Sequence, residues 1–348
     1  MSKTIDREFL KALPKCEHHM HLEGALSPAL LFQLAAQNNI TLPQDDECYA
    51  NAETLSTRYK GFTSLDDFLG YYYMGMSVLI QSSDFEALAW DYFQHASADG
   101  VQHAEVFFDP QAHMSRGVSY KTVLSGFTAA SERAETELGM TSMLTTCFLR
   151  HLPPKDCLDV FESDDVQASY EAGAVKAIGL DSSELPFPPD MFRDLYARAK
   201  AQGLRLTAHA GEEGPSSYIS TALDTLHVDR IDHGIRLAED PELMAKIAAR
   251  GTLLTVCPLS NVVLRCVDRV EQVPIRKFLD AGVKFSINSD DPAYFGGYIL
   301  DNYVAVQHAF ALSVGDWETI CKAAIEGSWC GEERKKEMLA VLDKVVKQ

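Results

Sequence analysis

Residues 16–24 read Cys-Glu-His-His-Met-His-Leu-Glu-Gly and end the first apolar run of a 348-residue chain. In a β-strand, successive side chains point to opposite faces, so residues two apart share a face. We therefore expect His19 and His21 to present their imidazoles side by side. Neutral imidazole is a common zinc ligand, and a catalytic zinc site uses about three protein ligands plus water. The stretch predicts a metal site at the end of the first strand.

Short apolar runs rich in β-forming residues alternate with helix-like segments along the chain. The expected strands span residues 15–22, 103–108, 143–149, 174–180, 204–209, 229–233, 252–257 and 284–288. Helical patterns fall between the later strands, at 189–202, 240–250 and 273–281. Strands separated by helices of this length are typical of βαβ units and a parallel sheet. Eight such units in about 300 residues favour a closed (β/α)₈ TIM barrel over an open doubly wound sheet.

One connection is much longer than the others. About 80 residues separate the first two expected strands, over residues 24–100, and their helical patterning argues against a structureless loop. We expect a helical insertion above the barrel mouth, within a single domain that covers residues 1–348. Tyr71, Tyr72 and Tyr73 are candidates for a lid, and a small helical core is the alternative for at least two of them.

Composition narrows the possible partners. The formal net charge is −19 and no basic patch is apparent, which argues against nucleic acid as a partner. No stretch approaches the roughly 18 apolar residues that suggest a membrane span. The polar start lacks a signal-peptide hydrophobic region. The eight scattered cysteines, without a Cys-x-x-Cys pair, are interpreted as free thiols in a reducing intracellular compartment.

Further metal-type ligands occur at the ends of later strands. His209 closes the fifth expected strand and Asp290 follows the eighth. In a barrel of this kind the active site lies at the C-terminal ends of the strands, so these residues should meet His19 and His21. Three imidazoles and one carboxylate suit one zinc ion and leave a position for water.

Two more residues at this end suggest acid–base chemistry. Glu212 lies three residues after His209, and a carboxyl near a metal can act as general acid if its pKa is raised. The alternative, a carboxylate stabilised at a helix N-terminus, fits the adjacent Glu213 better. His233, in an Asp-His-Gly sequence at the end of the sixth expected strand, is interpreted as functional.

Asp291 forms a tandem pair with Asp290. Two neighbouring carboxylates repel each other, so a nearby cation is the simplest explanation, with one carboxylate on zinc and the other on substrate or water. The alternative is a cap before Pro292. Five other polar residues near strand ends are assigned structural roles: Asp109, His113, Arg116, His151 and Asp181.

These residues together resemble the adenosine/adenine deaminase family, zinc aminohydrolases with a (β/α)₈ barrel. The matching motifs are residues 19–24 (His-Met-His-Leu-Glu-Gly), 207–212 (Thr-Ala-His-Ala-Gly-Glu), 232–234 (Asp-His-Gly), 257–261 (Cys-Pro-Leu-Ser-Asn) and 289–292 (Ser-Asp-Asp-Pro). They occur in the family's order, and the likeness covers nearly the entire chain. The stretches that resemble the fungal-type adenine deaminases are residues 14–19, 105–111, 180–189 and 291–298.

The resemblance implies one Zn²⁺ per chain and a role for each motif residue. It implies His19, His21, His209 and Asp290 as zinc ligands, Glu212 as proton donor, His233 as catalytic and Asp291 as a substrate contact. Two departures concern substrate size. Glu23 stands where adenosine deaminases commonly carry a ribose-contacting Asp, and Ser182-Ser183-Glu184 replaces a Gly-containing loop at the purine edge. Both are compatible with a base lacking its sugar, and Glu184 is the candidate acceptor for the N9–H of adenine.

The implied reaction is hydrolysis of adenine to hypoxanthine and ammonia in purine salvage. The nearest alternative is adenosine deaminase, which performs the same chemistry with a ribose pocket. A remote alternative is an inactive purine-binding barrel, because a fold does not imply activity. The expected partner is the small-molecule substrate alone, and the oligomeric state is left open. The expected location is the cytoplasm, with the nucleus as a second candidate compartment.

Overall fold

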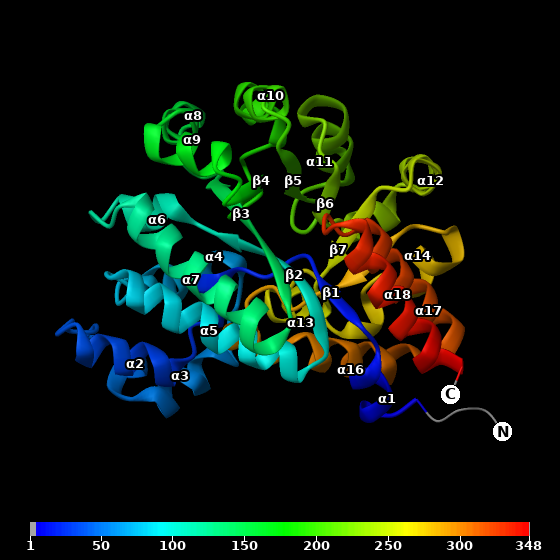
Figure 1. The fold of residues 1–348 in the computed structure, drawn as a ribbon, viewed down its shortest axis with the longest axis horizontal. Coiled ribbons are helices and arrows are strands. Elements are labelled where there is room, and N and C mark those ends of the chain that lie inside the picture. The colour runs from blue at the N-terminus through cyan, green and yellow to red at the C-terminus, as the bar shows by residue number, and fades with distance from the viewer. Residues whose placement is uncertain (1–4, 348) are drawn as a thin grey trace.

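Eight parallel strands surrounded by helices make up the computed structural model, which describes residues 5–347 (Figure 1). The strands follow one another around the sheet in sequence order, β1 to β8, and each neighbouring pair is parallel. They are β1 (Lys15–Glu17), β2 (Val101–Phe108), β3 (Thr141–Leu149), β4 (Val175–Asp181), β5 (Arg205–Ala210), β6 (Arg230–His233), β7 (Leu253–Val256) and β8 (Phe285–Ile287). The predicted (β/α)₈ barrel is confirmed.

The ring closes just beyond β1 and β8, at predicted metal ligands. The His21 N–H donates to the Asp290 carbonyl at 3.0 Å, and the Asp290 N–H donates to the His19 carbonyl at 3.0 Å. The expectation of one strand over residues 15–22 is wrong, because β1 ends at Glu17. There the His18 N–H bonds the Asn288 side chain at 2.8 Å instead of a neighbouring backbone. The closure brings His19, His21 and Asp290 together through backbone hydrogen bonds.

Helices cover the outside of the ring of strands. After β2 they are α6 (Pro110–Met114), α7 (Tyr120–Leu138), α8 (Pro154–Phe161), α9 (Asp164–Glu171), α10 (Arg193–Ala201), α11 (Ser216–Thr221), α12 (Pro241–Arg250), α13 (Pro258–Val263), α14 (Ile275–Ala281), α15 (Pro292–Phe295), α16 (Ile299–Phe310), α17 (Val314–Gly327) and α18 (Glu332–Lys347). α1 (Arg7–Ala12) precedes β1. The helices predicted at 189–202, 240–250 and 273–281 correspond to α10, α12 and α14, and a 3₁₀ turn at Pro189–Phe192 leads into α10.

Local sequence explains the bounds of α12. The Asp240 side chain caps its N-terminus by accepting from the Leu243 N–H at 3.0 Å, and Pro241 fits the first turn because it needs no donor there. Leu243 and Ile247 lie one turn apart and are buried against the barrel. Gly251, at φ 71°, ends the helix in the left-handed conformation that glycine adopts without strain.

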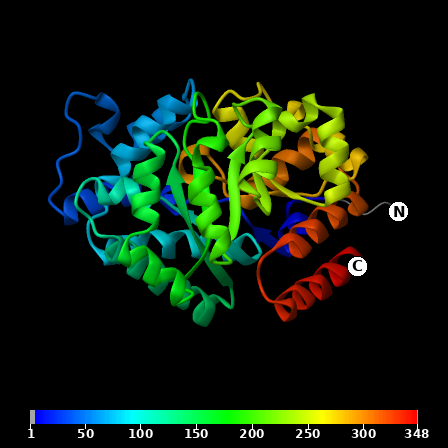
Figure 2. The same ribbon diagram turned by 90° about the horizontal axis from the view of Figure 1, so that it is seen from above.

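The long connection between β1 and β2 is helical, as expected. It contains α2 (Pro28–Gln37), α3 (Ala52–Tyr59), α4 (Leu65–Met76) and α5 (Ser82–Ala98). α5 packs along α7 and so serves as an outer helix of the barrel. α2 and α3 lie at one edge of the molecule in both views (Figures 1 and 2). One continuous hydrophobic cluster extends from Phe9 to Leu342 and includes side chains of this insertion. None of the helices within residues 5–347 is long and apolar enough to cross a membrane.

Candidate metal and catalytic site

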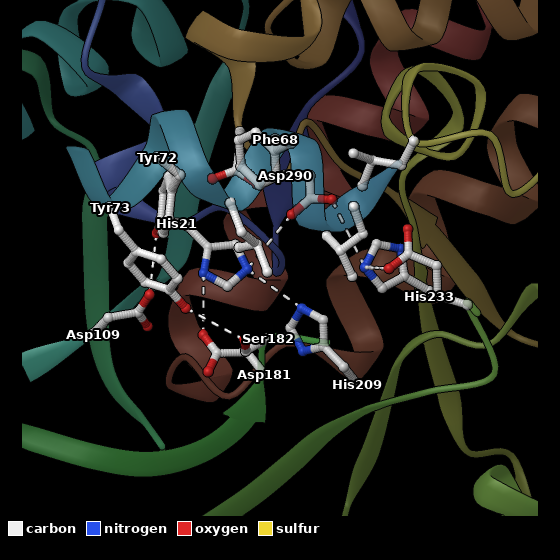
Figure 3. Close-up of a pocket in the computed structure, with 15 residues that line it drawn as sticks. His21, Phe68, Tyr72, Tyr73, Asp109, Asp181, Ser182, His209, His233 and Asp290 are labelled. Atoms are coloured by element: carbon white, nitrogen blue, oxygen red, sulfur yellow. Dashed lines mark hydrogen bonds and ion pairs between the residues drawn. The ribbon is translucent and has the colours of Figure 1, made fainter. Parts of the chain in front are cut away.

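The predicted site residues converge on one pocket at the C-terminal ends of the strands (Figure 3). The pocket has a volume of about 400 Å³, including space open to solvent. Six of the predicted residues line it: His21, His209, Glu212, His233, Asp290 and Asp291. His19, Glu23 and Glu184 are buried but do not line it. The barrel therefore assembles most of the site that the strand-end rule predicts.

Pairs of atoms among His19, His21, His209 and Asp290 have the spacing of metal ligands. The Nε2 atoms of His21 and His209 are 3.3 Å apart. Asp290 Oδ1 lies 3.2 Å from His19 Nε2 and 3.5 Å from His21 Nε2. Ligands about 2.0–2.1 Å from a tetrahedral zinc are roughly 3.3 Å from one another. His19 Nε2 is buried and has no hydrogen-bond partner among residues 5–347, so the donor set fits a bound cation.

Asp232 lies behind both His19 and His209, on the side of their Nδ1 atoms. His19 Nδ1 lies 2.9 Å from the Thr255 hydroxyl, which donates to Asp232 Oδ1 at 3.0 Å. Because the hydroxyl proton points to Asp232, its oxygen accepts the proton of His19 Nδ1. Asp232 Oδ2 lies 3.6 Å from His209 Nδ1. Metal-binding histidines commonly turn their second nitrogen to such oxygens, which leaves Nε2 with a free lone pair.

His21 is oriented by a different carboxylate. Its Nδ1 lies 3.5 Å from Asp181 Oδ2, at the end of β4. Its Nε2 faces His209 and Asp290 (Figure 3). The Nδ1 atoms of His21 and His209 thus each lie near a carboxylate at ion-pair distance, whereas His19 Nδ1 is hydrogen-bonded to Thr255.

By distance alone, His233 is as good a candidate metal ligand as His21. The tightest group of four has one ligand atom per residue, all within 4.8 Å of one another: His19, His209, His233 and Asp290. However, the Asn261 amide faces His233 Nδ1 at 3.3 Å and donates to it. A neutral imidazole that accepts at Nδ1 carries its proton on Nε2, where it cannot bind a metal. This tautomer favours His21 as the ligand and leaves His233 as a hydrogen-bond donor to the centre.

Glu212 is held in the environment that a proton donor needs. Its Oε1 accepts from the Asn261 amide at 3.1 Å, and its Oε2 lies 3.4 Å from His233 Nε2. Burial, with the charges of Asp290 and Glu184 nearby, raises the pKa of Glu212 well above its ordinary value. A carboxyl of this kind can hold a proton near neutral pH and deliver it to a substrate.

Asp290 and Asp291 form a tightly packed corner. Asp290 has φ 65° and His233 has φ 60°, a left-handed conformation that is unusual outside glycine and often found at functional sites. Burial and the neighbouring Asp290 raise the pKa of Asp291 well above its ordinary value. A Cβ on Gly24 would come 2.6 Å from the Asp291 Cα, so only glycine fits there. Asp291 Oδ1 is buried without a hydrogen-bond partner in the described chain, which leaves it available to a ligand.

Glu184 does not occupy the position predicted for it. Its two oxygens accept backbone N–H bonds from Gly211 at 3.1 Å, Glu212 at 3.0 Å and Gly214 at 2.9 Å. The carboxylate therefore holds the loop that carries Glu212 and does not face the pocket. The predicted role as acceptor for the substrate N9–H does not fit this geometry, because the carboxylate is turned to the backbone of residues 211–214 and does not line the pocket.

Glu23 also lies behind the pocket wall. Its Oε1 accepts from the Asp109 N–H at 3.1 Å and from His113 Nε2 at 2.9 Å. Arg116 donates to the other ring nitrogen of His113 at 2.7 Å, which places the ring proton toward Glu23. Burial and the nearby Asp109 raise the pKa of Glu23 to about 8. Glu23 supports the turn after β2, and the predicted direct contact with substrate does not fit this position.

Two pocket residues were missed by the sequence interpretation. Asp109 and Asp181, assigned structural roles, both line the pocket. Each keeps a buried Oδ1 that has no hydrogen-bond partner within residues 5–347. Asp109 directly follows β2, and Asp181 is the last residue of β4. The strand-end rule that selected His209 therefore also pointed to them.

The three consecutive tyrosines divide between the pocket and the insertion. Tyr72 and Tyr73, which are both on α4, line the pocket, and Tyr73 donates to the Ser182 hydroxyl at 3.3 Å. Tyr71 instead donates to Asp46 at 2.7 Å and stacks on Tyr49. α4 therefore covers the pocket through two of the tyrosines, and the third belongs to the core of the insertion.

The barrel and its polar centre define the chain as a hydrolase of the metal-dependent deaminase class. It belongs to the adenosine deaminase family, whose model matches residues 14–346. A protein of Aspergillus fumigatus named adenine deaminase is 60% identical over 345 residues, covering 99% of this chain and 97% of that protein.

Solved structures agree with this assignment. The crystal structure of adenine deaminase from Arthrobacter aurescens is 43% identical, with a TM-score of 0.92, and the match covers 97% of this chain and 100% of that one. An amidohydrolase from Burkhoderia ambifaria, solved with bound Zn, is 28% identical, with a TM-score of 0.86, over 99% and 97% of the two chains.

Proposed function

We propose that this chain hydrolyses adenine to hypoxanthine and ammonia, a reaction that serves purine salvage. The observation that carries the proposal is the grouping of His19, His21, His209 and Asp290 beside two buried carboxyls, Glu212 and Asp291, in one pocket. The names and the high identity of the relatives favour adenine over other aminopurines.

The metal is proposed to be one zinc ion, held by the three histidines and Asp290. Nitrogen-rich donor sets suit zinc, and a zinc-bound relative shares the fold. When bound, zinc supplies an activated water near neutral pH. Metal analysis of the purified protein should find about one zinc per chain, and His21→Ala should lose it. Full activity after complete metal removal would contradict this assignment.

The protein's side chains then divide the chemical work. Glu212 donates a proton to ring N1, which makes C6 more electrophilic. Asp291, whose raised pKa favours the protonated form, donates to N7. His233 donates from Nε2 to the attacking oxygen and orients it toward C6. Water adds at C6, one of its protons returns to Glu212 and the other goes to the amino group, which leaves as ammonia while the ring keeps the oxygen as hypoxanthine.

A substrate panel tests the proposal. Ammonia release should be measured with adenine, adenosine, AMP and guanine at equal enzyme and metal content. A site that bonds a polar hydrogen can reject an analogue that lacks it by roughly 10⁴. We therefore expect kcat/KM for adenine to exceed that for adenosine by about a thousandfold or more. Comparable turnover of both would assign the chain to nucleoside deamination with the same metal chemistry.

A further inference from the structure

Asp109 presents an unused carboxylate oxygen to the pocket. Its side chain is about 1% exposed, and its Oδ1 is buried without a hydrogen-bond partner in the described part of the chain. Its Oδ2 accepts from the Tyr72 hydroxyl at 3.2 Å. That hydroxyl comes from α4, the helix that covers the pocket. The side chain is thus held from the covering side, with one oxygen left for a ligand.

The surroundings of Asp109 call for a ligand that donates a hydrogen. One oxygen of Asp109, one of Asp181 and one ring nitrogen of His21 lie within 4.8 Å of one another. A buried carboxylate oxygen without a partner loses the hydrogen bonds that water gives it in the unfolded chain, which is unfavourable. A second carboxylate nearby adds repulsion. An N–H group of a bound molecule relieves both costs, whereas an anionic group or a ring nitrogen lone pair would increase them.

The position of Asp109 matches one atom of a purine. In the proposed arrangement, N1 of the purine faces Glu212, N7 faces Asp291, and C6 faces the three histidines proposed to hold the metal. On the purine ring N9 lies on the side away from C6. Figure 3 shows Asp109 on the far side of His21 from His233. N3 and N9 both lie on that edge, and N9 is the one that carries a hydrogen in adenine and the sugar in adenosine, so N9 is the atom that suits an acceptor such as Asp109.

We propose that Asp109 accepts the N9–H of the free base and so sets the preference of this enzyme for adenine over its nucleoside. The inference rests on the proposed function. Asp181 also keeps a buried Oδ1 without a partner within residues 5–347, but its Oδ2 lies 3.5 Å from the ring of His21, so its carboxylate is placed to orient that proposed metal ligand. Neither Glu184, which accepts three backbone N–H bonds, nor Glu23 lines the pocket. Asp109 takes the role that the sequence interpretation assigned to Glu184.

The probe that isolates this contact is 9-methyladenine, which replaces only the N9 hydrogen. Its kcat/KM is compared with that of adenine in the zinc-loaded wild-type enzyme and in Asp109→Ala. The wild type should prefer adenine by about a thousandfold or more. In Asp109→Ala, adenine should lose about a hundredfold while 9-methyladenine stays the same or gains, so the ratio should fall at least about a hundredfold.

Two further variants separate recognition from structural damage. Tyr72→Phe removes only the hydroxyl that holds Asp109, and should lower the ratio by about five- to tenfold, the value of one hydrogen bond. Glu184→Gln, a buried acid outside the pocket, should reduce both substrates equally and leave the ratio unchanged. Metal content and the unfolding transition of each variant show that it is folded. Should Asp109→Ala fail to fold, the Tyr72→Phe ratio decides.

The outcomes distinguish this inference from the proposed function. If wild-type enzyme releases no ammonia from adenine, the proposed function is wrong. If the wild type prefers adenine but the ratio in Asp109→Ala stays within about threefold of the wild-type ratio, Asp109 has only a structural role and the inference is overturned.

Discussion

The two ends of the barrel differ in how their buried charged side chains are paired. Toward the N-terminal ends of the strands, Arg230 Nη2 pairs with Glu105 Oε2 at 2.7 Å, and the guanidinium lies over the Trp329 ring at 3.9 Å. At the C-terminal ends, Asp109 and Asp181 crowd together with a buried oxygen each that has no hydrogen-bond partner among residues 5–347.

This difference shows how the fold separates stability from function. Buried polar groups in native proteins are nearly always paired, so an unpaired group calls for a partner such as a ligand, an ion or a bound water. In (β/α)₈ barrels the C-terminal face carries the chemistry and the N-terminal face carries stability. Two carboxylates of like charge close together at one end, and a carboxylate paired with a guanidinium at the other, follow that division. Substitutions at the two ends should therefore differ in kind, as the following predictions state from the largest effect to the smallest.

Arg230→Met should give the largest loss of stability. It leaves Glu105 buried without its arginine, and breaking one side of a buried pair costs about 3–5 kcal/mol in the free energy of unfolding. Urea unfolding followed by circular dichroism measures the loss, while kcat per folded molecule should stay within about twofold. The double variant Glu105→Gln with Arg230→Met should recover part of the stability. A loss below about 1 kcal/mol would mean that the pair is not structural.

Lys15, the first residue of β1, is a second buried charge at the N-terminal ends of the strands, and it should make the free energy of unfolding depend on pH. Its Nζ donates to the Leu10 carbonyl at 2.7 Å and the Leu13 carbonyl at 3.0 Å, and burial lowers the pKa of Lys15 from 10.5 to about 8. Between these two values the unfolded chain binds more protons than the folded one, so stability from this group rises with pH. The rise should reach about 3 kcal/mol in total.

The matched control for Lys15 is Lys15→Met, because other groups titrate in the same window and cancel in the difference. The unfolding free energy of the wild type relative to Lys15→Met should increase from pH 8 to pH 10.5. A difference that does not change with pH would show that Lys15 keeps an ordinary pKa in the folded protein.

At the catalytic end, Glu212→Gln should reduce activity without reducing stability. The substitution removes the transferable proton but keeps the shape, so kcat should fall by at least about a hundredfold. Zinc content and the unfolding transition should remain as in the wild type. Glu213→Gln is the control, since Glu213 does not line the pocket and its loss should be much milder. Similar activities of the two variants would show that Glu212 is not the proton donor.

The smallest expected effect concerns Asp232, which supports two proposed ligands at once. It lies 3.6 Å from His209 Nδ1 and reaches His19 through Thr255. Asp232→Asn should weaken zinc affinity by about 10- to 100-fold, as measured by competition with a chelator. Thr255→Val breaks only the link to His19 and should weaken it less. Metal retention equal to that of the wild type in Asp232→Asn would limit Asp232 to the barrel core.

Local rules were enough to predict much of this fold and site. The expectation that His19 and His21 lie side by side is met, with ring centroids 5.4 Å apart, although β1 ends at Glu17 and backbone bonds to Asp290 hold the two residues. The capping residue and proline predicted where α12 begins. Strand ends selected His209 and Asp290, which line the same pocket. These inferences succeeded because each depends on periodicity or on a residue's place at a strand end, both of which can be read from neighbouring residues.

Contacts between distant segments decided the remaining roles. The sequence predicts Glu184 as a substrate contact from its place in the loop, but its carboxylate accepts hydrogen bonds from the backbone of residues 211–214. Asp109 looked structural, yet its free oxygen faces the pocket. His233 and His21 are both histidines at strand ends, and only the Asn261 amide, which acts on the tautomer of His233, separates them.

The sequence by itself therefore determined the class of fold, the end of the barrel that carries the site and the residue types available there. Only the tertiary structure decided which oxygens and nitrogens stay free. The physical reason is that hydrogen bonding saturates: whether a carboxylate can bind a substrate depends on which donors the fold brings to it, and those donors come from strands and loops far away in the sequence.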